Sequence, residues 1–203
     1  MLISALKQTS PERVTVLLDD GSEVRSTLSV ITEMRLFTGK ELDDAELCML
    51  RDASALSLCK TRALSMVAKR AMSRRELIDK LKEKGEDERN AEACAEWMVI
   101  AGFINDGTYA GMIVRHYAAK GYGEGRIRTE LIRRGISREL WDEAFTEMPE
   151  QNDKLQRYIN SRLQDPEDTQ QVKKVCDGLY RRGYSWDEIK HALEEFRTNS
   201  EEY

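Results

Sequence analysis

The chain has 203 residues, of which 40% are hydrophobic and 34% are charged, and its formal net charge at pH 7 is -5. This length is enough to bury a core, and no apolar run reaches the roughly 20 residues that a membrane-spanning helix needs. The first residues lack the basic and apolar regions of a signal peptide, so we expect a cytoplasmic protein without a membrane anchor.

The first 60 residues differ in pattern from the others. Residues 14–25 alternate between apolar and polar side chains around Asp20-Gly21, a dipeptide typical of hairpin turns. We therefore predict a small α+β appendage over residues 1–60. Its other predicted elements are a third strand at residues 2–7, a short helix at residues 28–35, and a long helix from Asp43 to about Met72.

The remainder of the chain contains a pattern anchored on a glycine. Two apolar residues four positions apart are followed, after four more positions, by a glycine, and a basic residue precedes that glycine. The pattern occurs three times, with glycines 50 and 48 residues apart: Leu77-x3-Leu81-x3-Gly85, Ile127-x3-Leu131-x3-Gly135 and Val175-x3-Leu179-x3-Gly183.

Helix signals follow each glycine. Two residues further on stands a possible N-cap, Asp87, Ser137 or Ser185, and the apolar positions after it share one face of a helix. Glycine is the usual residue at the end of a helix, where the backbone turns to positive φ. Each unit therefore predicts a helix, a glycine C-cap, a two-residue turn and a second helix.

Further helical stretches at residues 106–119 and 152–163 lie between these pairs, so a unit has about three helices. In Asp165-Pro-Glu-Asp168 we expect Pro166 at the first position of a helix. Repeats of this length are typical of helical arrays. We predict a mainly α fold: tandem three-helix repeats in an elongated curved array, after the small N-terminal α+β appendage. The predicted domains are residues 1–60, 61–121, 122–165 and 166–203.

Three glycines in five positions, Gly121, Gly123 and Gly125, raise the question of a phosphate-binding loop. A dinucleotide-binding fingerprint needs a preceding strand and GxGxxG spacing, whereas here the preceding segment is helical in pattern and the spacing is GxGxG. A P-loop would need a Gly-Lys-Ser or Gly-Lys-Thr ending. We interpret Gly121–Gly125 as a flexible joint between the first and second repeats.

The sequence contains no GxSxG or HExxH motif and no cysteine with a plausible histidine base nearby. No two of its cysteines form a CxxC pair, and histidines are few, so a zinc site is not expected. We expect no catalytic activity, no cofactor and no metal site. We also expect all the cysteines to be buried thiols: Cys48, Cys59, Cys94 and Cys176.

Basic residues are concentrated in the middle of the chain, where residues 60–140 carry 17 basic and 12 acidic side chains. Such a segment suits DNA or an acidic protein surface, and a solvated helix face is the alternative. Arg126, Glu130 and Arg133 are expected to share an outer stripe of their helix. Because arginine suits carboxylates and phosphates alike, we predict a partner-binding surface. Its predicted residues are Arg74, Arg75, Arg115, Lys120, Tyr122, Arg126, Arg128, Arg133 and Arg181.

Three motifs in the helical part carry a family resemblance. They are Ala63-Leu-x5-Arg70-x2-Ser73-x2-Glu76-Leu77-x3-Leu81-x2-Lys84-Gly85, Gly102-Phe-Ile-Asn-Asp106-x2-Tyr109-Ala110, and Gly125-Arg-Ile-x3-Leu131-x2-Arg134-Gly135-Ile136. Together they resemble the RecX family, the regulatory proteins that modulate the RecA recombinase.

The resemblance implies an all-helical body of tandem three-helix repeats and a role in DNA repair and the SOS response. It implies a protein that binds in the helical groove of the RecA–DNA filament. There it would inhibit ATP hydrolysis, strand exchange and coprotease activity, and limit filament growth. We accordingly expect a monomer whose partner is the RecA filament. DNA would be contacted as part of the filament and only weakly by itself, because the chain is acidic overall.

Two other functions stay open at this point. One is a helical module that acts directly on DNA, which would need many phosphate contacts and an affinity that falls steeply with salt. The other is a scaffold whose repeats hold a different partner.

Overall fold

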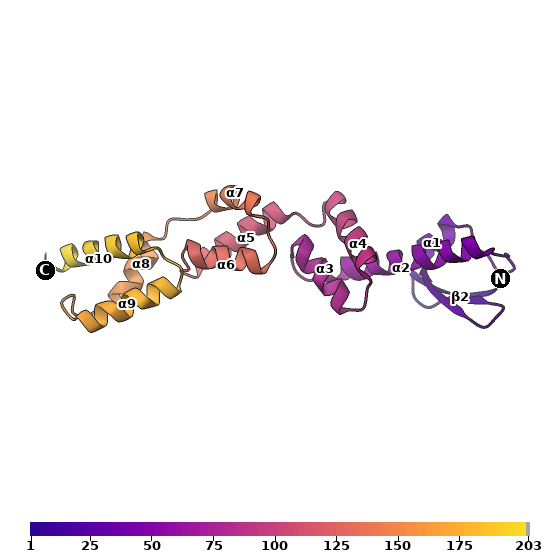
Figure 1. Cartoon of the computed structure of the whole chain (residues 1–203), viewed down its shortest axis with the longest axis horizontal. Coiled ribbons are helices and arrows are strands. Elements are labelled where there is room, and N and C mark those ends of the chain that lie inside the picture. The colour runs from indigo at the N-terminus through magenta and orange to yellow at the C-terminus, as the bar shows by residue number, and fades with distance from the viewer. Residues whose placement is uncertain (202–203) are drawn as a thin grey trace. The chain divides into compact units, whose positions relative to one another are not determined.

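The computed structural model is mainly helical, with a three-stranded antiparallel sheet at the N-terminus (Figure 1). The structure describes residues 1–201, and side chains as far as residue 198. It divides into two compact units, Met1–Ile104 and the residues from Asn105 onward. The predicted mainly α fold with a small N-terminal α+β appendage is confirmed. The helices are α1 (Leu28–Glu33), α2 (Asp44–Val67), α3 (Arg74–Glu83), α4 (Glu88–Ile100), α5 (Asp106–Ala119), α6 (Glu124–Arg133), the short 3-10 helix η1 (Arg138–Leu140), α7 (Trp141–Thr146), α8 (Asn152–Asn160), α9 (Thr169–Arg181) and α10 (Trp186–Glu201).

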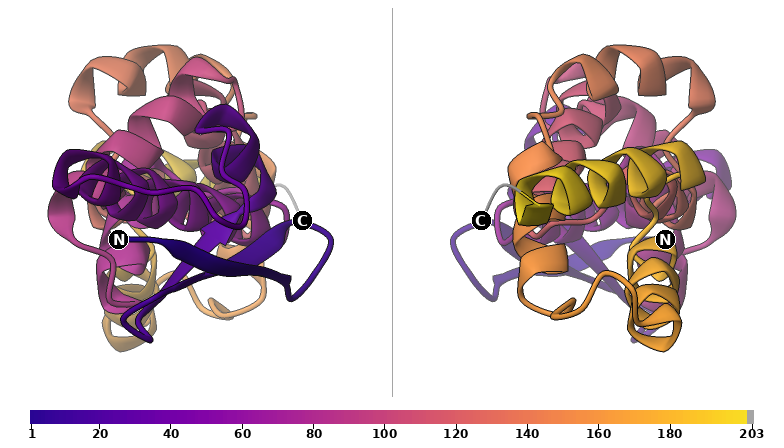
Figure 2. Two further views of the ribbon diagram at one scale, coloured as in Figure 1. Left: turned by 90° about the vertical axis from the view of Figure 1, so that its right-hand side faces the viewer. Right: turned by 90° about the vertical axis from the view of Figure 1, so that its left-hand side faces the viewer.

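The sheet consists of β1 (Ile3–Gln8), β2 (Arg13–Leu18) and β3 (Glu23–Thr27), paired in that order. Successive side chains of a strand point to opposite faces, and the apolar ones of β2, such as Val14 and Val16, are buried. The helices α1 and α2 cover this apolar face (Figure 2). The predicted hairpin and the third strand are therefore confirmed.

The long helix α2 serves two cores. It begins at a capping box, in which Asp43 accepts a hydrogen bond from the amide of Glu46 at 2.7 Å. Its first half places Leu50 in the core under the sheet, and its second half places Cys59 and Ala63 in the first helical core. One continuous helix thus ties the sheet to the first repeat.

The helical part of the described chain is built around three cores. The first contains the end of α2 with α3 and α4, the second contains α5, α6 and α7, and the third contains α8, α9 and α10. Each predicted C-cap glycine has a positive φ, 86° at Gly85, 69° at Gly135 and 88° at Gly183. The glycine-anchored helix pairs are therefore confirmed.

These cores group the helices differently from the predicted domains. The predicted ranges 61–121 and 122–165 assign α5 to the first repeat and α8 to the second. In the structure α5 packs with α6 and α7, and α8 packs with α9 and α10. The cores thus favour domain boundaries before α5 and before α8, each one helix earlier than predicted. In each of these units the additional helix comes before the glycine-linked pair and not after it. The division into domains itself stays a prediction.

The predicted place of Pro166 is wrong. The helix α9 starts after it, at Thr169, with Asp168 as the N-cap. The carboxylate of Asp168 accepts hydrogen bonds from two backbone amides, those of Gln170 at 2.8 Å and Gln171 at 3.1 Å. This double cap fixes the helix start beyond the proline.

Candidate partner-binding site

The glycine-rich segment forms the junction between the second and third cores. The amide of Gly123 donates to the carbonyl oxygen of Arg182, and the amide of Gly125 to that of Gly183, both at 2.9 Å. A Cβ atom on Gly183 would lie 2.1 Å from the backbone nitrogen of Arg126. Only residues without a Cβ allow two backbone segments to approach this closely.

This contact corrects the interpretation of Gly121–Gly125 as a flexible joint between the first and second repeats. The segment follows α5, which ends at the C-cap Lys120, and α6 begins at Glu124 with Gly123 as its N-cap. Its backbone is held against the turn between α9 and α10. The sequence pattern did not reveal this contact because Gly183 lies far along the chain.

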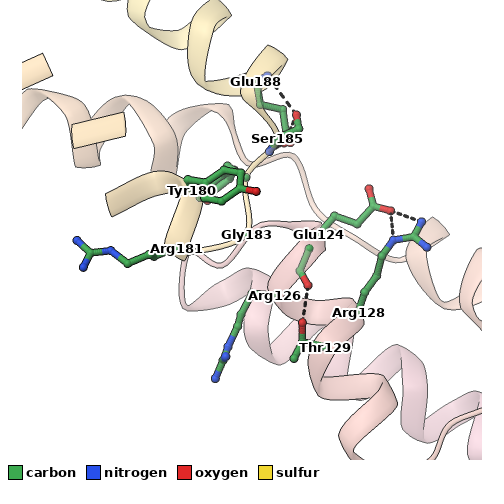
Figure 3. Close-up of a pocket in the computed structure, with 11 residues that line it drawn as sticks. Glu124, Arg126, Arg128, Thr129, Tyr180, Arg181, Gly183, Ser185 and Glu188 are labelled. Atoms are coloured by element: carbon green, nitrogen blue, oxygen red, sulfur yellow. Dashed lines mark hydrogen bonds and ion pairs between the residues drawn. The ribbon is translucent and has the colours of Figure 1, made fainter. Parts of the chain in front are cut away.

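A groove of about 540 Å³ opens beside the junction, between the first turns of α6 and the α9–α10 turn (Figure 3). The side chains of Arg126 and Arg181 extend to one side of it and that of Arg128 to the other (Figure 3). The charged and aromatic side chains that line this groove are those of Glu124, Arg126, Arg128, Tyr180, Arg181, Tyr184 and Glu188.

The two arginines on α6 are paired with carboxylates of their own helix. Arg126 Nη2 lies 3.2 Å from Glu130 Oε1, and Arg128 Nε donates to Glu124 Oε1 at 2.7 Å. Arg181 differs, because its Nε donates to the carbonyl oxygen of Asp177 at 3.2 Å. Among the described residues Arg181 has no carboxylate partner, so its charge is available to a ligand.

The burial of Glu130 shows that the prediction of an exposed stripe made of Arg126, Glu130 and Arg133 on α6 is wrong for Glu130. It is only 4% exposed and accepts hydrogen bonds from Arg126 and Arg133, the latter at 2.7 Å. Burial raises the pKa of this carboxyl, but the hydrogen bonds from Arg133 and Tyr117 and the two arginine charges outweigh that effect. The pKa of Glu130 therefore lies below its ordinary value.

Two other predicted residues lie close to the junction. Tyr122 is half-buried, and its ring lies 5.6 Å from the ring of Tyr117 and 5.7 Å from the guanidinium of Arg182. Lys120 is exposed and lines a separate pocket. Tyr122 thus contributes to the packing of the junction, while Lys120 remains accessible.

The other predicted arginines are dispersed. Arg115 on α5 forms an ion pair with Glu147, and Arg133 pairs with Glu130 as described above. In the unit Met1–Ile104, Arg74 Nε lies 3.6 Å from Glu96 Oε2, and Arg75 Nε lies 3.9 Å from Asp79 Oδ2. The structure therefore brings three predicted residues, Arg126, Arg128 and Arg181, into one groove. That any of the nine binds a partner stays a prediction.

Sequence reasoning missed Tyr180, which lines the groove and is 69% exposed. The signal was present in the helical pattern. Tyr180 directly follows Leu179, a repeat position that faces the core, and consecutive residues of a helix point about 100° apart. A large aromatic residue beside a core position could therefore have been assigned to the surface.

The described residues contain no cluster of three or more His, Cys, Asp or Glu side chains placed to hold a metal ion. Over the same residues, no helix combines the length and apolar character needed to cross a membrane. Cys59, Cys94 and Cys176 are buried, whereas Cys48 is exposed. The prediction for Cys48 is wrong because it follows Leu47, which occupies the buried face of α2, and so faces away from the core.

The fold and the groove define the class of protein, a chain of tandem three-helix domains that presents a charged groove. Two family models match, one described as the first three-helix domain of RecX at residues 59–97 and the other as its second at residues 105–144. These ranges follow the first and second helical cores. The chain belongs to the RecX family.

Relatives and solved structures agree with this assignment. Regulatory protein RecX of Vibrio parahaemolyticus serotype O3:K6 is 31% identical over 146 residues, covering 70% of this chain and 94% of the relative. Regulatory protein RecX of Clostridium botulinum (strain Eklund 17B / Type B) is 24% identical over 200 residues, covering 94% and 92%. A crystal structure of regulatory protein RecX matches with a TM-score of 0.76 and 25% identity, covering 95% of this chain and 98% of that one. The crystal structure of RecX from Lactobacillus salivarius has a TM-score of 0.62 at 22% identity, covers 72% and 99%, and shows the shared fold alone.

Proposed function

We propose that this protein is a negative regulator of the RecA recombinase. It binds in the groove of the RecA–DNA filament, inhibits ATP hydrolysis, strand exchange and coprotease activity, and limits filament growth. Membership of a family of regulatory proteins is the observation that carries the proposal. The protein acts by occupying a surface, as a monomer in the cytoplasm, and without chemistry of its own.

The groove between α6 and the α9–α10 turn supports protein contact as the main mode of binding. Tyr180 and Arg181 are exposed neighbours there, and Arg181 has no carboxylate partner among the described residues. Tyrosine and arginine are enriched among the residues that contribute most to protein interfaces. A carboxylate on the recombinase surface would complete the hydrogen bonding of the Arg181 guanidinium.

Co-sedimentation tests the proposal directly. RecA filaments assembled on single-stranded DNA with a non-hydrolysable ATP analogue are pelleted with this protein, and naked single-stranded DNA of the same length is the control. We expect the protein to pellet with the filament far more than with the naked DNA. Protein that stays in the supernatant at saturating filament concentrations would contradict the proposal.

The groove is tested by replacing both exposed neighbours, Tyr180→Ala with Arg181→Ala. We expect the affinity for the filament to fall roughly tenfold, because the variant removes both an aromatic side chain and a charge-assisted hydrogen bond. The matched control is Lys173→Ala with Lys174→Ala, two exposed residues of the same helix outside the groove. Equal affinities of the two double variants would remove the groove from the interface.

Direct action on DNA is the competing function, and the basic segment 60–140 favours it. Most of the predicted arginines in that segment are neutralised by carboxylates, as in the pairs Arg115–Glu147 and Arg128–Glu124. A DNA-binding protein would bind naked single strands with an affinity that falls steeply with salt. A scaffold, in contrast, would bind the filament without lowering its ATP hydrolysis.

A further inference from the structure

A second pocket, of about 290 Å³, lies where the end of α5 meets α8 and the end of α9. Its lining differs in charge from that of the groove between α6 and the α9–α10 turn. Carboxylates contribute to the groove, whereas the second pocket has basic side chains and no acidic one. These basic residues are Lys120, Lys154, Arg157 and Arg182.

The cations of this pocket are bound to neutral groups. Lys154 Nζ donates to the carbonyl oxygen of Ala118 at 2.6 Å, and Arg157 Nε donates to that of Asp153 at 3.1 Å. Lys120 Nζ lies 5.9 Å from the centre of the Tyr117 ring. Carbonyl oxygens and rings orient a cation but leave its net charge uncompensated.

Arg182, which lines the pocket, is held in place by three contacts. Its Nη1 donates to the carbonyl oxygen of Gly121 at 3.4 Å, and its guanidinium lies over the rings of Tyr158 at 4.9 Å and Tyr122 at 5.7 Å. A guanidinium fixed in this way loses little conformational entropy when it binds a ligand.

None of the four cations forms an ion pair with a carboxylate among the described residues. This separates them from the arginines of α6, each of which has such a partner. Like charges gathered without counter-charges repel one another, and the repulsion is relieved when an anion binds between them.

A buried hydroxyl supplies a second observation. Tyr184 lines the same pocket and is 2% exposed, and its hydroxyl has no hydrogen-bond partner in the part of the chain that the structure describes. Buried polar groups are nearly always hydrogen-bonded. The hydroxyl is thus a donor without a partner, on a residue that lines both this pocket and the groove beside α6.

We propose that this pocket binds a phosphate group. A phosphate offers several acceptor oxygens and a negative charge, which match ammonium, guanidinium and hydroxyl donors. The phosphate belongs either to a nucleic-acid strand or to a small phosphate compound. The site does not depend on the proposed function, because the binding needs no recombinase.

The test uses the full chain and two probes, inorganic pyrophosphate by calorimetry and fluorescein-labelled oligothymidine by anisotropy. The pocket variant is Lys120→Gln with Arg157→Gln, whose side chains are exposed and do not hold the junction together. For whichever probe the wild type binds, we expect the affinity of this variant to be about tenfold lower or more. The reason is that the glutamines cannot form the charge-assisted hydrogen bonds of Lys120 and Arg157 to phosphate. The matched control, Lys173→Gln with Lys174→Gln, removes the same charge from exposed positions on α9 and should stay within about twofold of the wild type.

The two probes separate the sources of the phosphate. Pyrophosphate binding that the pocket variant weakens identifies a small phosphate compound. Binding of oligothymidine alone identifies a strand, and the slope of log affinity against log salt should then fall in magnitude by about 0.7 for each phosphate that the variant no longer neutralises. Binding of neither probe, or equal weakening in both double variants, overturns the proposal. The single variant Lys120→Gln, with circular dichroism as the check on folding, answers the same question if the double variant is unstable.

Discussion

Glu130 shows how one buried carboxylate organises the basic surface of α6. It holds Arg126 and Arg133 by hydrogen bonds while lying almost wholly inside the protein. Reversing the charge of both arginines would therefore leave three carboxylates together, one of them buried. Such a variant would lower the stability of the second core as well as any affinity for a partner, which is why Tyr180 and Arg181 are the better test.

The lowered pKa of Glu130 predicts a pH-dependent contribution to stability. A carboxyl whose folded pKa lies below its unfolded value of 4.5 stabilises the fold above that pH, and the contribution is lost as the pH falls through the folded pKa. We expect Glu130→Gln to lower the free energy of unfolding at pH 7 by roughly 1–3 kcal/mol. The difference from the wild type should shrink below about pH 4.5.

Denaturant titrations at a series of pH values measure this effect. The control is Glu143→Gln, because Glu143 is exposed on α7 and forms no ion pair among the described residues. Its stability should follow that of the wild type at every pH. A loss for Glu130→Gln that is the same at pH 7 and pH 3 would mean that the ion pairs do not stabilise the fold.

At the scale of elements, the junction between α6 and the α9–α10 turn depends on close backbone contact. Gly121 and Gly183 both have positive φ, 75° and 88°, in which an alanine costs roughly 1–3 kcal/mol. An added Cβ has ordinary space at Gly121 but would overlap the backbone of Arg126 at Gly183. We therefore expect Gly183→Ala to destabilise the protein more than Gly121→Ala, as measured by thermal unfolding.

At both glycines an alanine would have the cost of a positive φ. The difference in melting temperature between the two variants therefore measures the effect of the overlap between the Cβ at position 183 and the backbone of Arg126. A melting temperature for Gly183→Ala equal to that for Gly121→Ala would show that the two backbones can separate without loss. The junction would then be mobile, as the glycine composition first suggested.

The elements that the sequence predicted correctly depend on local rules. The apolar spacing of residues such as Leu77 and Leu81, the N-cap at Asp87 and the positive φ of Gly85 are each decided within a few residues. The junction, the burial of Glu130 and the all-basic pocket depend on segments that meet only after folding. A glycine that permits a helix to end and a glycine that permits another backbone to touch it look the same in a sequence.

At the scale of the whole molecule, family membership followed from motifs within residues 63–136, because their combination is specific although each is weak. The candidate sites did not follow in the same way. Three of the nine predicted residues line the groove, whereas Lys154 and Arg157 of the second pocket carry no local signal on α8. A surface that several helices build together cannot be assigned from the charge of any one of them.

The central claim is that this chain lowers RecA activity by occupying the filament. The most direct measurement is the rate of ATP hydrolysis by the cognate RecA on single-stranded DNA, titrated with the chain of 203 residues. A bound regulator that limits filament growth affects more subunits than it contacts, so we expect inhibition when the protein is well below one copy per RecA. A rate that stays unchanged up to equimolar protein, with circular dichroism showing folded helices, would contradict the account.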